Sequence, residues 1–337
     1  MRLQAATDLV DRALGRYGLR GSGDVELVKY RENYVFKLSR PAGSYAVRVH
    51  RTGYRGEDEI RTEMAYLDAL AERGLPVPRL VRTLDGELLC SEELEGEDVY
   101  VDVLHWVEGA SPLGDIASGL DGTSTLAPAD FRALGERLGE LHLALIDLGR
   151  LPGFARGAWN TPGLAGRRPL WGDPRRVDRL AGRDAETLGL ALAALERDLA
   201  DLPGDEQHFG VIHADLTPEN VLVSGSGMTL IDFDDFGEGW HLFDLATALF
   251  FYTPHPRYED FRTALFGGYQ SVRGVPSGFF AAWDVLLLAR ATTYLGWAGQ
   301  RAGDPEADFI ADRVAPHVVR MAQDYLRSRA HGHTVEA

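Results

Sequence analysis

The chain has 337 residues, of which 51 are acidic and 35 are Lys or Arg, giving a formal net charge of −16 at pH 7. This length accommodates two lobes with separate cores, and the negative charge argues against nucleic acid or anionic membranes as partners. The single cysteine, Cys90, excludes a disulfide within the chain and argues against a cysteine-based zinc site.

Neither the N-terminus nor the longest apolar run predicts a membrane segment. The first residues lack the apolar core of a signal peptide. The longest apolar run, 279–298, is interrupted by Asp284 and Arg290, so it predicts a buried helix and not a membrane span. We therefore expect a cytoplasmic protein.

The first hundred residues predict a small sheet and two helices. Residues 3–18 have the apolar spacing of a short amphipathic helix. Runs rich in Val and Tyr at 25–30, 34–38 and 45–49 predict an antiparallel meander. A second helix is predicted from about residue 55 to Gly74. Further strands are predicted at 80–83, 88–92 and 99–107.

Glu63 lies among the apolar positions of the second predicted helix. It is either an exposed charge at the edge of the apolar face or the ion-pair partner of a basic residue on the third strand. Both interpretations remain open at this point.

The segment 103–109 runs from a predicted strand into a loop that ends at Pro112, and it marks the predicted lobe boundary. The division is a first lobe at 1–104, a hinge at 105–109 and a second lobe at 110–337. The second lobe is expected to be mostly helical, with helices at 128–146, 185–202, 242–252, 258–272, 278–301 and 305–329.

Residues 149–183 form a long segment without a clear period, rich in Gly, Pro, Trp and Arg. A loop of this length in a compact domain is usually functional or disordered, and Trp159 and Trp171 argue for order. Its arginines either pair locally with nearby aspartates on the surface or take part in substrate capture.

The residues that carry chemistry gather at 213–235. His213, Asp215 and Asn220 form an H-x-D-x-x-x-x-N pattern, and Asp232 follows a short apolar run. Phosphoryl transfer from a nucleotide needs an aligned hydroxyl, metal ions on the phosphates and a nearby carboxylate. Asp215 fits the carboxylate that orients the hydroxyl and takes its proton. Asn220 and Asp232 offer a neutral and a charged oxygen to Mg²⁺.

The surrounding residues predict how these side chains are held. Residues 228–231 predict a strand that holds Asp232, with 221–223 as its hairpin partner. His213 is interpreted as a structural hydrogen-bonding residue because Asp215 already supplies the carboxylate. His142, within a long predicted helix, is interpreted as a core or surface residue and not as a ligand.

Asp234 and Asp235 extend the acidic cluster beyond Asp232. Carboxylates this close repel one another unless a cation or hydrogen-bond donors compensate. They either assist with metals or a substrate ammonium, or they cap a loop or a helix start. We keep both possibilities for each residue.

The stretch 213–220, followed by 231–235, resembles the aminoglycoside phosphotransferase/choline kinase family, whose members are related to the protein kinases. The H-x-D spacing, in place of H-R-D, favours this group. Residues 239–246 are similar to the branch that contains type II homoserine kinases, hydroxylysine kinases and the bacterial stress-response kinase. The resemblance extends from about Val25 to the C-terminal helices.

The resemblance implies an α+β, bilobal protein-kinase-like fold. Residues 1–104 would form the N-lobe, an antiparallel sheet plus helix that covers the nucleotide. Residues 110–337 would form a larger, mostly helical C-lobe with the catalytic loop and the substrate site. The family uses Asp244 mainly to brace the catalytic loop, so the resemblance implies a structural role for it.

The resemblance also implies residues of a nucleotide site. Ala46-Val47-Arg48 occupies the strand position of the family's Ala-x-Lys, so Arg48 would contact the α- and β-phosphates with Glu63 as its ion-pair partner. The loop at 31–33 has no glycine, but 32–36 fits the branch pattern and implicates Asn33. Adenine would bond to backbone groups near His105 and Val107.

We therefore expect a kinase that uses ATP and Mg²⁺ and phosphorylates a hydroxyl of a small molecule. The substrate would be an amino alcohol, a hydroxy amino acid or an aminosugar antibiotic. It would lie beside Asp215, near Asp234, Asp235 and Trp171.

Two alternatives remain. One is a Ser/Thr protein kinase of the bacterial stress-response type. The other is a nucleotide-binding pseudokinase. Arg48 in place of lysine is the only feature that favours it, and the intact set of Asp215, Asn220 and Asp232 argues against it. The sequence gives no indication of the oligomeric state.

Overall fold

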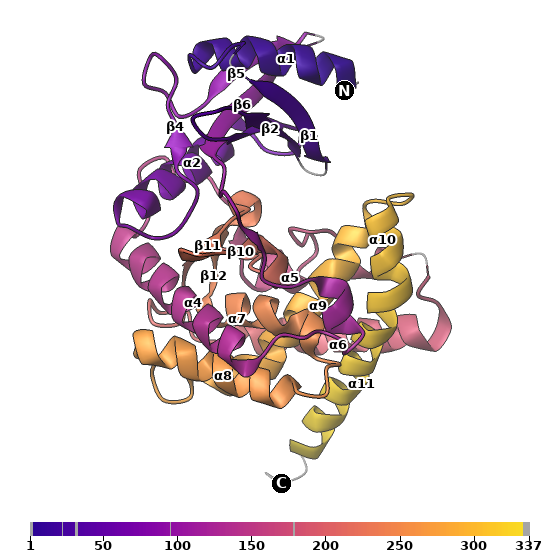
Figure 1. Cartoon of the computed structure of the whole chain (residues 1–337). Helices are drawn as coiled ribbons and strands as arrows, with labels where there is room; N and C mark the ends of the chain where they lie inside the picture. The colour runs from indigo at the N-terminus through magenta and orange to yellow at the C-terminus, as the bar shows by residue number, and fades with distance from the viewer. Residues whose placement is uncertain (1–2, 22, 31–32, 95, 178, 333–337) are drawn as a thin grey trace. The chain divides into compact units, whose positions relative to one another are not determined.

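The computed structural model describes residues 3–21, 23–30, 33–94, 96–177 and 179–332, and its elements are shown in Figure 1. The chain forms two compact units, each assembled from separate segments. Unit 1 comprises Met1–Leu113, Leu148–Arg156 and Asn220–Asp234. Unit 2 comprises Gly114–Asp147, Gly157–Glu219 and Asp235–Ala337.

Unit 1 is built around a six-stranded antiparallel sheet. The strand order is β1-β2-β3-β6-β4, with β5 also paired to β6. The strands are β1 (Asp24–Tyr30), β2 (Asn33–Ser39), β3 (Tyr45–His50), β4 (Leu80–Val81), β5 (Cys90–Leu94) and β6 (Glu97–His105). The predicted antiparallel meander is confirmed by β1, β2 and β3.

Helix α1 (Leu3–Arg16) covers one face of this sheet. Its apolar residues, among them Leu9 and Ala13, pack in one core with Phe36 of β2 and Val101 of β6. The alternation of buried and half-buried residues along β2 follows from the two-residue period of a strand. The opposite face of the sheet carries the polar residues described below.

Helix α2 (Glu57–Glu72) follows β3 and begins at a capping box, in which the Glu59 side chain accepts from the Gly56 backbone N–H at 2.9 Å. Acidic residues fill its first turn, where their negative charge interacts favourably with the positive end of the helix dipole. A second, smaller sheet of unit 1 contains β7 (Ser111–Pro112), β10 (Val221–Ser224) and β11 (Gly227–Leu230). The predicted hairpin is confirmed, with Val221 opposite Leu230.

Unit 2 is mostly helical, as predicted. Its helices are α3 (Ile116–Leu120), α4 (Pro128–Leu148, ending at the unit boundary), α5 (Thr161–Ala165), α6 (Gly182–Ala200), α7 (His241–Leu249), α8 (Tyr258–Val272), α9 (Trp283–Gly299), α10 (Pro305–Phe309) and α11 (Ala315–Gly332). A short sheet in the order β8-β12-β9 joins β8 (Ala158–Trp159), β12 (Gly237–Trp240) and β9 (Phe209–Ile212).

Helix α9 of unit 2 is buried along most of its length. Every residue from 286 to 296 is buried, which confirms the prediction of a buried helix in this apolar run. The helix starts later than predicted, because residues Phe279–Ala282 form a 3₁₀ turn. None of the helices in the described residues has the length and hydropathy to cross a membrane.

Two other segments differ from their predicted outline. The predicted helix at 305–329 is interrupted by a π-helical turn, Ile310–Val314, between α10 and α11. The segment 149–183 contains β8, α5 and a 3₁₀ turn, Pro174–Arg176. Trp159 and Trp171 are both buried and their rings are in contact, so aromatic packing, which has no sequence period, holds the described part of this segment around them.

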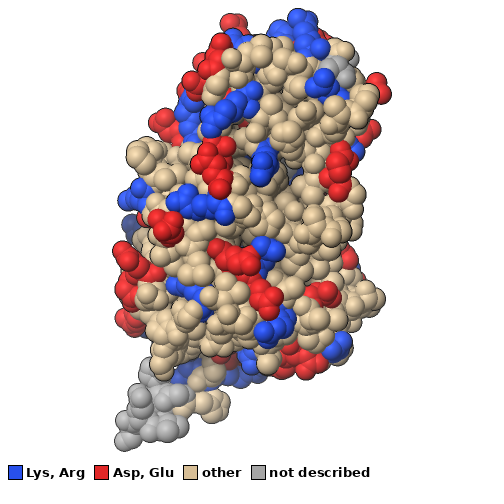
Figure 2. All heavy atoms as spheres, turned by 60° about the vertical axis from the view of Figure 1, so that its left-hand side comes forward, with Lys and Arg blue, Asp and Glu red and all other residues tan. Residues whose placement is uncertain are grey.

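Charged side chains of both signs are mixed on one face of the molecule (Figure 2). On the face shown in Figure 2, Lys and Arg side chains lie among Asp and Glu side chains, with tan surface between them. That face therefore has no broad basic stripe of the kind that binds nucleic acid.

Helices α4 and α8 pack closely through glycines. A Cβ atom at Gly135 would lie 2.1 Å from the Leu265 carbonyl oxygen, and one at Gly268 would lie 2.0 Å from the Arg132 carbonyl oxygen. Only a residue without a side chain fits at this distance, because real Cβ atoms do not approach backbone oxygens so closely.

We expect Gly135→Ala to lower the free energy of unfolding by about 1–3 kcal/mol, because α8 must move to admit the methyl group. The matched control is Gly189→Ala on α6, where a Cβ meets nothing within 4 Å and where Ala favours the helix by roughly 1 kcal/mol. Urea denaturation of both variants measures the difference. Equal stabilities would contradict the close α4–α8 contact.

Candidate active site

The loop that follows β9 is held in a strained backbone conformation. Among the described residues, only Ala214 (φ 67°) and Asp232 (φ 66°) are non-glycine residues with positive φ. This region is costly for residues with a Cβ and persists only where the surroundings enforce it. One of these residues directly precedes Asp215 and the other is the predicted metal ligand, so the strain coincides with the predicted chemistry.

Asp244 of α7 enforces the first strained position. Its carboxylate accepts the backbone N–H groups of His213 at 2.9 Å and of Ala214 at 2.7 Å. Asp244 is fully buried, and burial raises its pKa to about 6 although these donors favour the charged form. Asp244 therefore braces the loop that carries Asp215, in agreement with what the family resemblance implies.

A buried chain of side chains supports Asp244 from the other side. His142 of α4 lies with Nε2 3.0 Å from the Asp244 carboxylate and with Nδ1 2.7 Å from the Tyr269 hydroxyl. Burial holds the pKa of His142 well below its ordinary value, so the ring is neutral. Arg273 donates to the Tyr269 hydroxyl. His142 is thus a core residue that orients Asp244, consistent with its interpretation from the sequence.

His213 is also fully buried. Its Nδ1 lies 3.3 Å from the backbone nitrogen of Asp215 and accepts its N–H. The ring therefore shapes the loop around Asp215, as expected of a structural hydrogen-bonding residue.

Arg290 of α9 contacts the Asp215 side chain directly. Its Nη2 forms an ion pair with Asp215 Oδ1, and its Nη1 donates to the Ala214 carbonyl oxygen at 3.3 Å. The Arg290 side chain is fully buried, whereas that of Asp215 is 24% exposed. The guanidinium lies 4.5 Å from the centre of the Trp171 ring and 4.1 Å from that of Tyr294.

The sequence did not reveal the role of Arg290, which appeared only as an interruption of an apolar run. The available signal was its position in the middle of a helix predicted to be buried, because a buried arginine requires a partner. That partner is 75 residues away in sequence, and no local pattern connects the two.

Trp171 and Asp235 lie beside this arrangement within unit 2. Trp171 Nε1 donates to Asp235 Oδ1 at 2.9 Å, and Trp159 Nε1 donates to the Asp235 carbonyl oxygen at 3.0 Å. Through the Trp171–Arg290 stacking contact, unit 2 brings together three of the predicted site residues, Asp215, Trp171 and Asp235.

Asn220 and Asp232 lie at the open end of the β10–β11 hairpin in unit 1. The backbone N–H of Ile231 donates to the Asn220 carbonyl oxygen at 3.0 Å, which places the two predicted ligands at the same end. Asn220 is 8% exposed, whereas the Asp232 side chain is 36% exposed and lies 3.4 Å from the Lys29 ammonium.

This donor set fits Mg²⁺, which typically takes one or two protein carboxylates and completes its shell with waters and phosphate oxygens. In the described residues, no group of three or more His, Cys, Asp or Glu side chains could hold a metal ion alone. A metal ion at Asn220 and Asp232 would therefore take its remaining ligands from water and from a bound phosphate.

Asp234 is buried and held within unit 1. Asn33 Nδ2 lies 3.5 Å from Asp234 Oδ1, and Arg55 Nη2 donates to the Asp234 carbonyl oxygen at 3.0 Å. Arg156 donates to the same carbonyl oxygen. The structure thus brings the predicted residues Asn33 and Asp234 together. Residues 31 and 32 of the predicted covering loop lie outside the described residues.

Arg48 belongs to a buried ionic cluster that extends from β3 to β6. Its Nη1 lies 2.8 Å from Glu63 Oε1 and its Nε lies 2.9 Å from Asp102 Oδ1. His50 Nε2 lies 2.6 Å from the other oxygen of Asp102. Burial opposes the charges of Arg48 and Asp102, but their mutual attraction outweighs it, so the pKa of Arg48 is raised and that of Asp102 is lowered.

The predicted Arg48–Glu63 ion pair is present, but Asp102 was not anticipated. Its signal was a charged residue with a valine on either side, in the middle of a predicted strand. In the predicted hinge, the His105 N–H donates to the Arg79 carbonyl oxygen at 2.8 Å and the Trp106 N–H to that of Ser44 at 2.9 Å. Val107 follows them.

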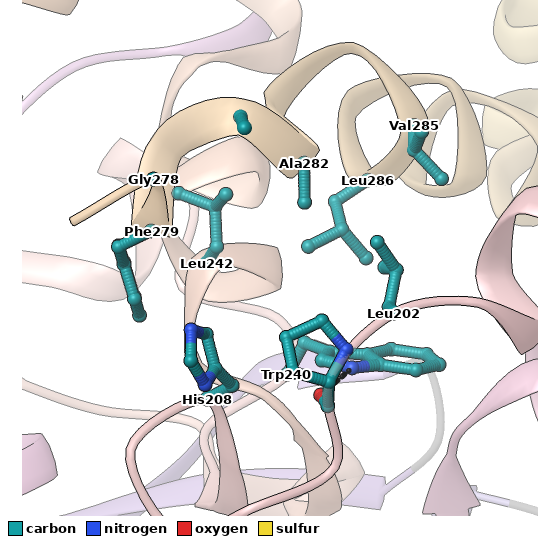
Figure 3. Close-up of a pocket in the computed structure, with 11 residues that line it drawn as sticks. Leu202, His208, Trp240, Leu242, Gly278, Phe279, Ala282, Val285 and Leu286 are labelled. Carbon is teal, nitrogen blue, oxygen red and sulfur yellow. Dashed lines mark hydrogen bonds between the residues drawn. The ribbon is translucent and has the colours of Figure 1, made fainter. Parts of the chain in front are cut away.

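A separate cavity of about 200 Å³ lies in unit 2 (Figure 3). It is lined mostly by apolar residues between α9, β12 and the loop after α6, including Leu202, Phe279 and Leu286. Trp240 Nε1 donates to the Pro203 carbonyl oxygen at its edge, at 3.0 Å. None of the predicted site residues lines this cavity.

The sequence and the structure both resemble known kinases. Residues 26–280 match the phosphotransferase enzyme family. A homoserine kinase of Methylobacterium radiotolerans is 30% identical over 279 residues, which cover 78% of this chain and 76% of the relative. An amicoumacin kinase of Bacillus subtilis is 25% identical over 252 residues, which cover 74% of this chain and 69% of the relative.

Among solved structures, a microcompartment-associated aminopropanol kinase aligns with a TM-score of 0.84 at 28% identity, covering 96% of this chain and 98% of that one. The amicoumacin kinase hAmiN in complex with AMP-PNP, Ca²⁺ and Ami aligns with a TM-score of 0.73 at 18% identity, covering 95% of this chain and 96% of that one. At this identity the second match shows the fold alone. The expected α+β, protein-kinase-like fold is confirmed. The chain belongs to the phosphotransferase enzyme family and is a kinase with an alcohol group as acceptor.

Proposed function

We propose that this kinase transfers the γ-phosphoryl group of ATP, with Mg²⁺, to the hydroxyl of a small amino alcohol or hydroxy amino acid. The observation that carries the proposal is the fixed environment of Asp215, which is held by Arg290 on a loop braced by Asp244. The relatives named for homoserine and aminopropanol support the acceptor class, because both compounds carry a hydroxyl and an amino group.

Asp215 is the proposed base. The acceptor oxygen forms a bond to the γ-phosphorus while the bond to the bridging oxygen of ADP breaks, and the hydroxyl proton passes to the Asp215 carboxylate. Because phosphoryl transfer depends mainly on alignment, the role of Arg290 and Ala214 is to fix the direction in which this carboxylate points.

Asn220 and Asp232 are the proposed Mg²⁺ ligands. When bound, the ion would neutralise charge on the phosphate oxygens. The positive φ of Asp232 sets the direction of its carboxylate, and the hairpin bond between Ile231 and Asn220 keeps the two ligands together.

The nucleotide side of the proposed site comprises residues of unit 1. We assign the adenine contacts to backbone groups near His105 and Val107. The role that we assign to the buried pair of Arg48 and Glu63 is to hold this face of the sheet in place. Asn33 holds Asp234, for which we propose a bracing role because it is 4% exposed and contacts a cationic side chain.

On the acceptor side we propose Asp235 and Trp171. The carboxylate of Asp235 is fixed by the Trp171 indole N–H, and the two residues lie beside Arg290 and Asp215 in unit 2. A carboxylate next to an aromatic ring suits an ammonium group through charge pairing and a cation–π contact. This arrangement favours acceptors that carry an amino group.

An acceptor screen tests the proposal. Purified protein with Mg²⁺ and ATP is assayed for ADP release with homoserine, 1-amino-2-propanol, ethanolamine, choline, an aminoglycoside and a peptide substrate mixture. We expect acceptor-dependent ADP release with an amino alcohol or a hydroxy amino acid, and Asp215→Asn should lower kcat by about 100- to 10,000-fold. Asp201→Asn, an exposed carboxylate in the same unit, should leave it unchanged. Release that depends only on the peptides would overturn the proposal.

Arg290→Met should lower kcat by about 100-fold, because Asp215 loses the cation that fixes its direction. The affinity for ADP should stay unchanged, since Arg290 lies in unit 2 with the proposed base. Arg290→Lys, which keeps the charge, should recover part of kcat. Steady-state kinetics and ADP titration measure the two effects.

The control for this series is Arg301→Met, which removes an arginine just beyond the C-terminus of α9. Thermal unfolding identifies a variant that has merely lost its fold. If folded Arg290→Met retains the wild-type kcat, Arg290 has no positioning role.

A further inference from the structure

We propose that Lys29 of β1 is the cation that contacts the phosphate groups of the bound nucleotide, and that Arg48 is a buried structural residue. This inference rests on the proposed function, because it concerns the nucleotide of the same reaction. It differs from the family resemblance, which implicates Arg48 in phosphate binding.

The first observation is that Arg48 has almost no capacity left for a ligand. Its Nε and Nη2 donate to the two oxygens of Asp102, each at 2.9 Å, and its Nη1 donates to Glu63 at 2.8 Å. Nη2 also faces the Met64 sulfur at 3.6 Å. Only one N–H, on Nη1, remains, and the side chain is 8% exposed.

The charge of this cluster also disfavours phosphate. Asp102 and Glu63 supply two carboxylates against the single guanidinium of Arg48, and His50 shares one oxygen of Asp102. Even with His50 protonated, the net charge of these four side chains is not positive. A phosphate group approaching this buried cluster would gain little, because its attraction to Arg48 is offset by the two carboxylates.

The second observation is the register of the sheet. A β-bulge between Leu27 and Lys29 shifts the pairing, so Lys29 lies opposite Val35, where a regular ladder would place it opposite Tyr34. Directly paired residues point to the same face of a sheet. Tyr34 points to the face that packs in the α1 core, so the bulge turns Lys29 to the other face.

That other face is the one that carries Arg48. Val35 of β2 pairs with Arg48 of β3, and Arg48 pairs with Asp102 of β6. Lys29 therefore stands in the same cross-strand row as Arg48, two strands away, which corresponds to about 10 Å. The two cations share one sheet face, but only Lys29 is accessible, with 41% of its side chain exposed.

The third observation is the position of the Lys29 ammonium, 3.4 Å from Asp232 Oδ2. Asp232 is a proposed Mg²⁺ ligand, and the metal ions of such sites bridge phosphate oxygens. A cation within reach of this carboxylate is also within reach of phosphates bound there. Lysine suits the role as a compact charge on a flexible stem, so it can leave Asp232 when the nucleotide arrives.

The composition points to the same hairpin. The chain has only two lysines, Lys29 and Lys37, among its 35 basic residues. Both belong to the β1–β2 pair. Lys37 lies with its ammonium 4.7 Å from the centre of the Trp106 ring and is therefore engaged near the predicted hinge. Because lysine is so rare here, amine-specific chemistry can report on Lys29 in the unmodified chain.

The experiment compares ADP with adenosine, which differ in the phosphates. Calorimetric titration of Lys29→Met should give a Kd for ADP about tenfold or more above that of the wild type, as expected for the loss of charge-assisted hydrogen bonds. The Kd for adenosine should not change. Arg20→Met removes the same charge from the exposed turn after α1 and should change neither Kd.

A second measurement needs no substitution and so cannot be affected by a misfolded variant. The wild-type chain is labelled with acetic anhydride, and mass spectrometry reads the acetylation of each lysine. ADP should protect Lys29 from acetylation and adenosine should not. The inference fails if Lys29→Met binds ADP like the wild type, or if ADP leaves Lys29 as reactive as before. If the wild type binds neither compound, the proposed function fails as well, so the two failures are distinguishable.

Discussion

The candidate active site depends on one interaction, in which the buried carboxylate of Asp244 accepts hydrogen bonds from two consecutive backbone N–H groups. Hydrogen bonds to a charged acceptor in a buried setting are among the strongest available to a protein. They hold Ala214 at positive φ and so fix the position of the Asp215 backbone. From the other side, Arg290 contacts both the Ala214 carbonyl oxygen and the Asp215 carboxylate. Asp215, the proposed base, is thus constrained through its backbone and its side chain.

The proposed chemistry is divided between two units that each contribute a different function. Unit 2 carries the base with Arg290, Trp171 and Asp235, which are the groups that would meet the acceptor. Unit 1 carries the metal ligands and the sheet face with Lys29, which would meet the nucleotide. The segment from Asn220 to Asp234 belongs to unit 1 although its flanking residues belong to unit 2. The motif therefore supplies residues to both units within a short stretch of sequence.

Much of the fold could be predicted because helices and strands have local periods, and the motif at 213–232 could be recognised because its spacing reflects the chemistry. What could not be predicted depends on partners far apart in sequence. Arg290 and Asp215 are 75 residues apart, and Arg48 and Asp102 are 54 residues apart. The orientation of Lys29 depends on a bulge, which leaves no compositional trace in this strand.

The most direct test is the turnover of Asp244→Asn, whose side chain keeps the shape of Asp244 but loses its charge and one acceptor oxygen. Because the variant changes the support of the loop and not the groups that react, we predict that kcat falls by about 100-fold. The affinity for ADP should be unchanged and the protein should remain folded. A folded Asp244→Asn variant with wild-type kcat would contradict the claim that this buried carboxylate sets the position of the catalytic base.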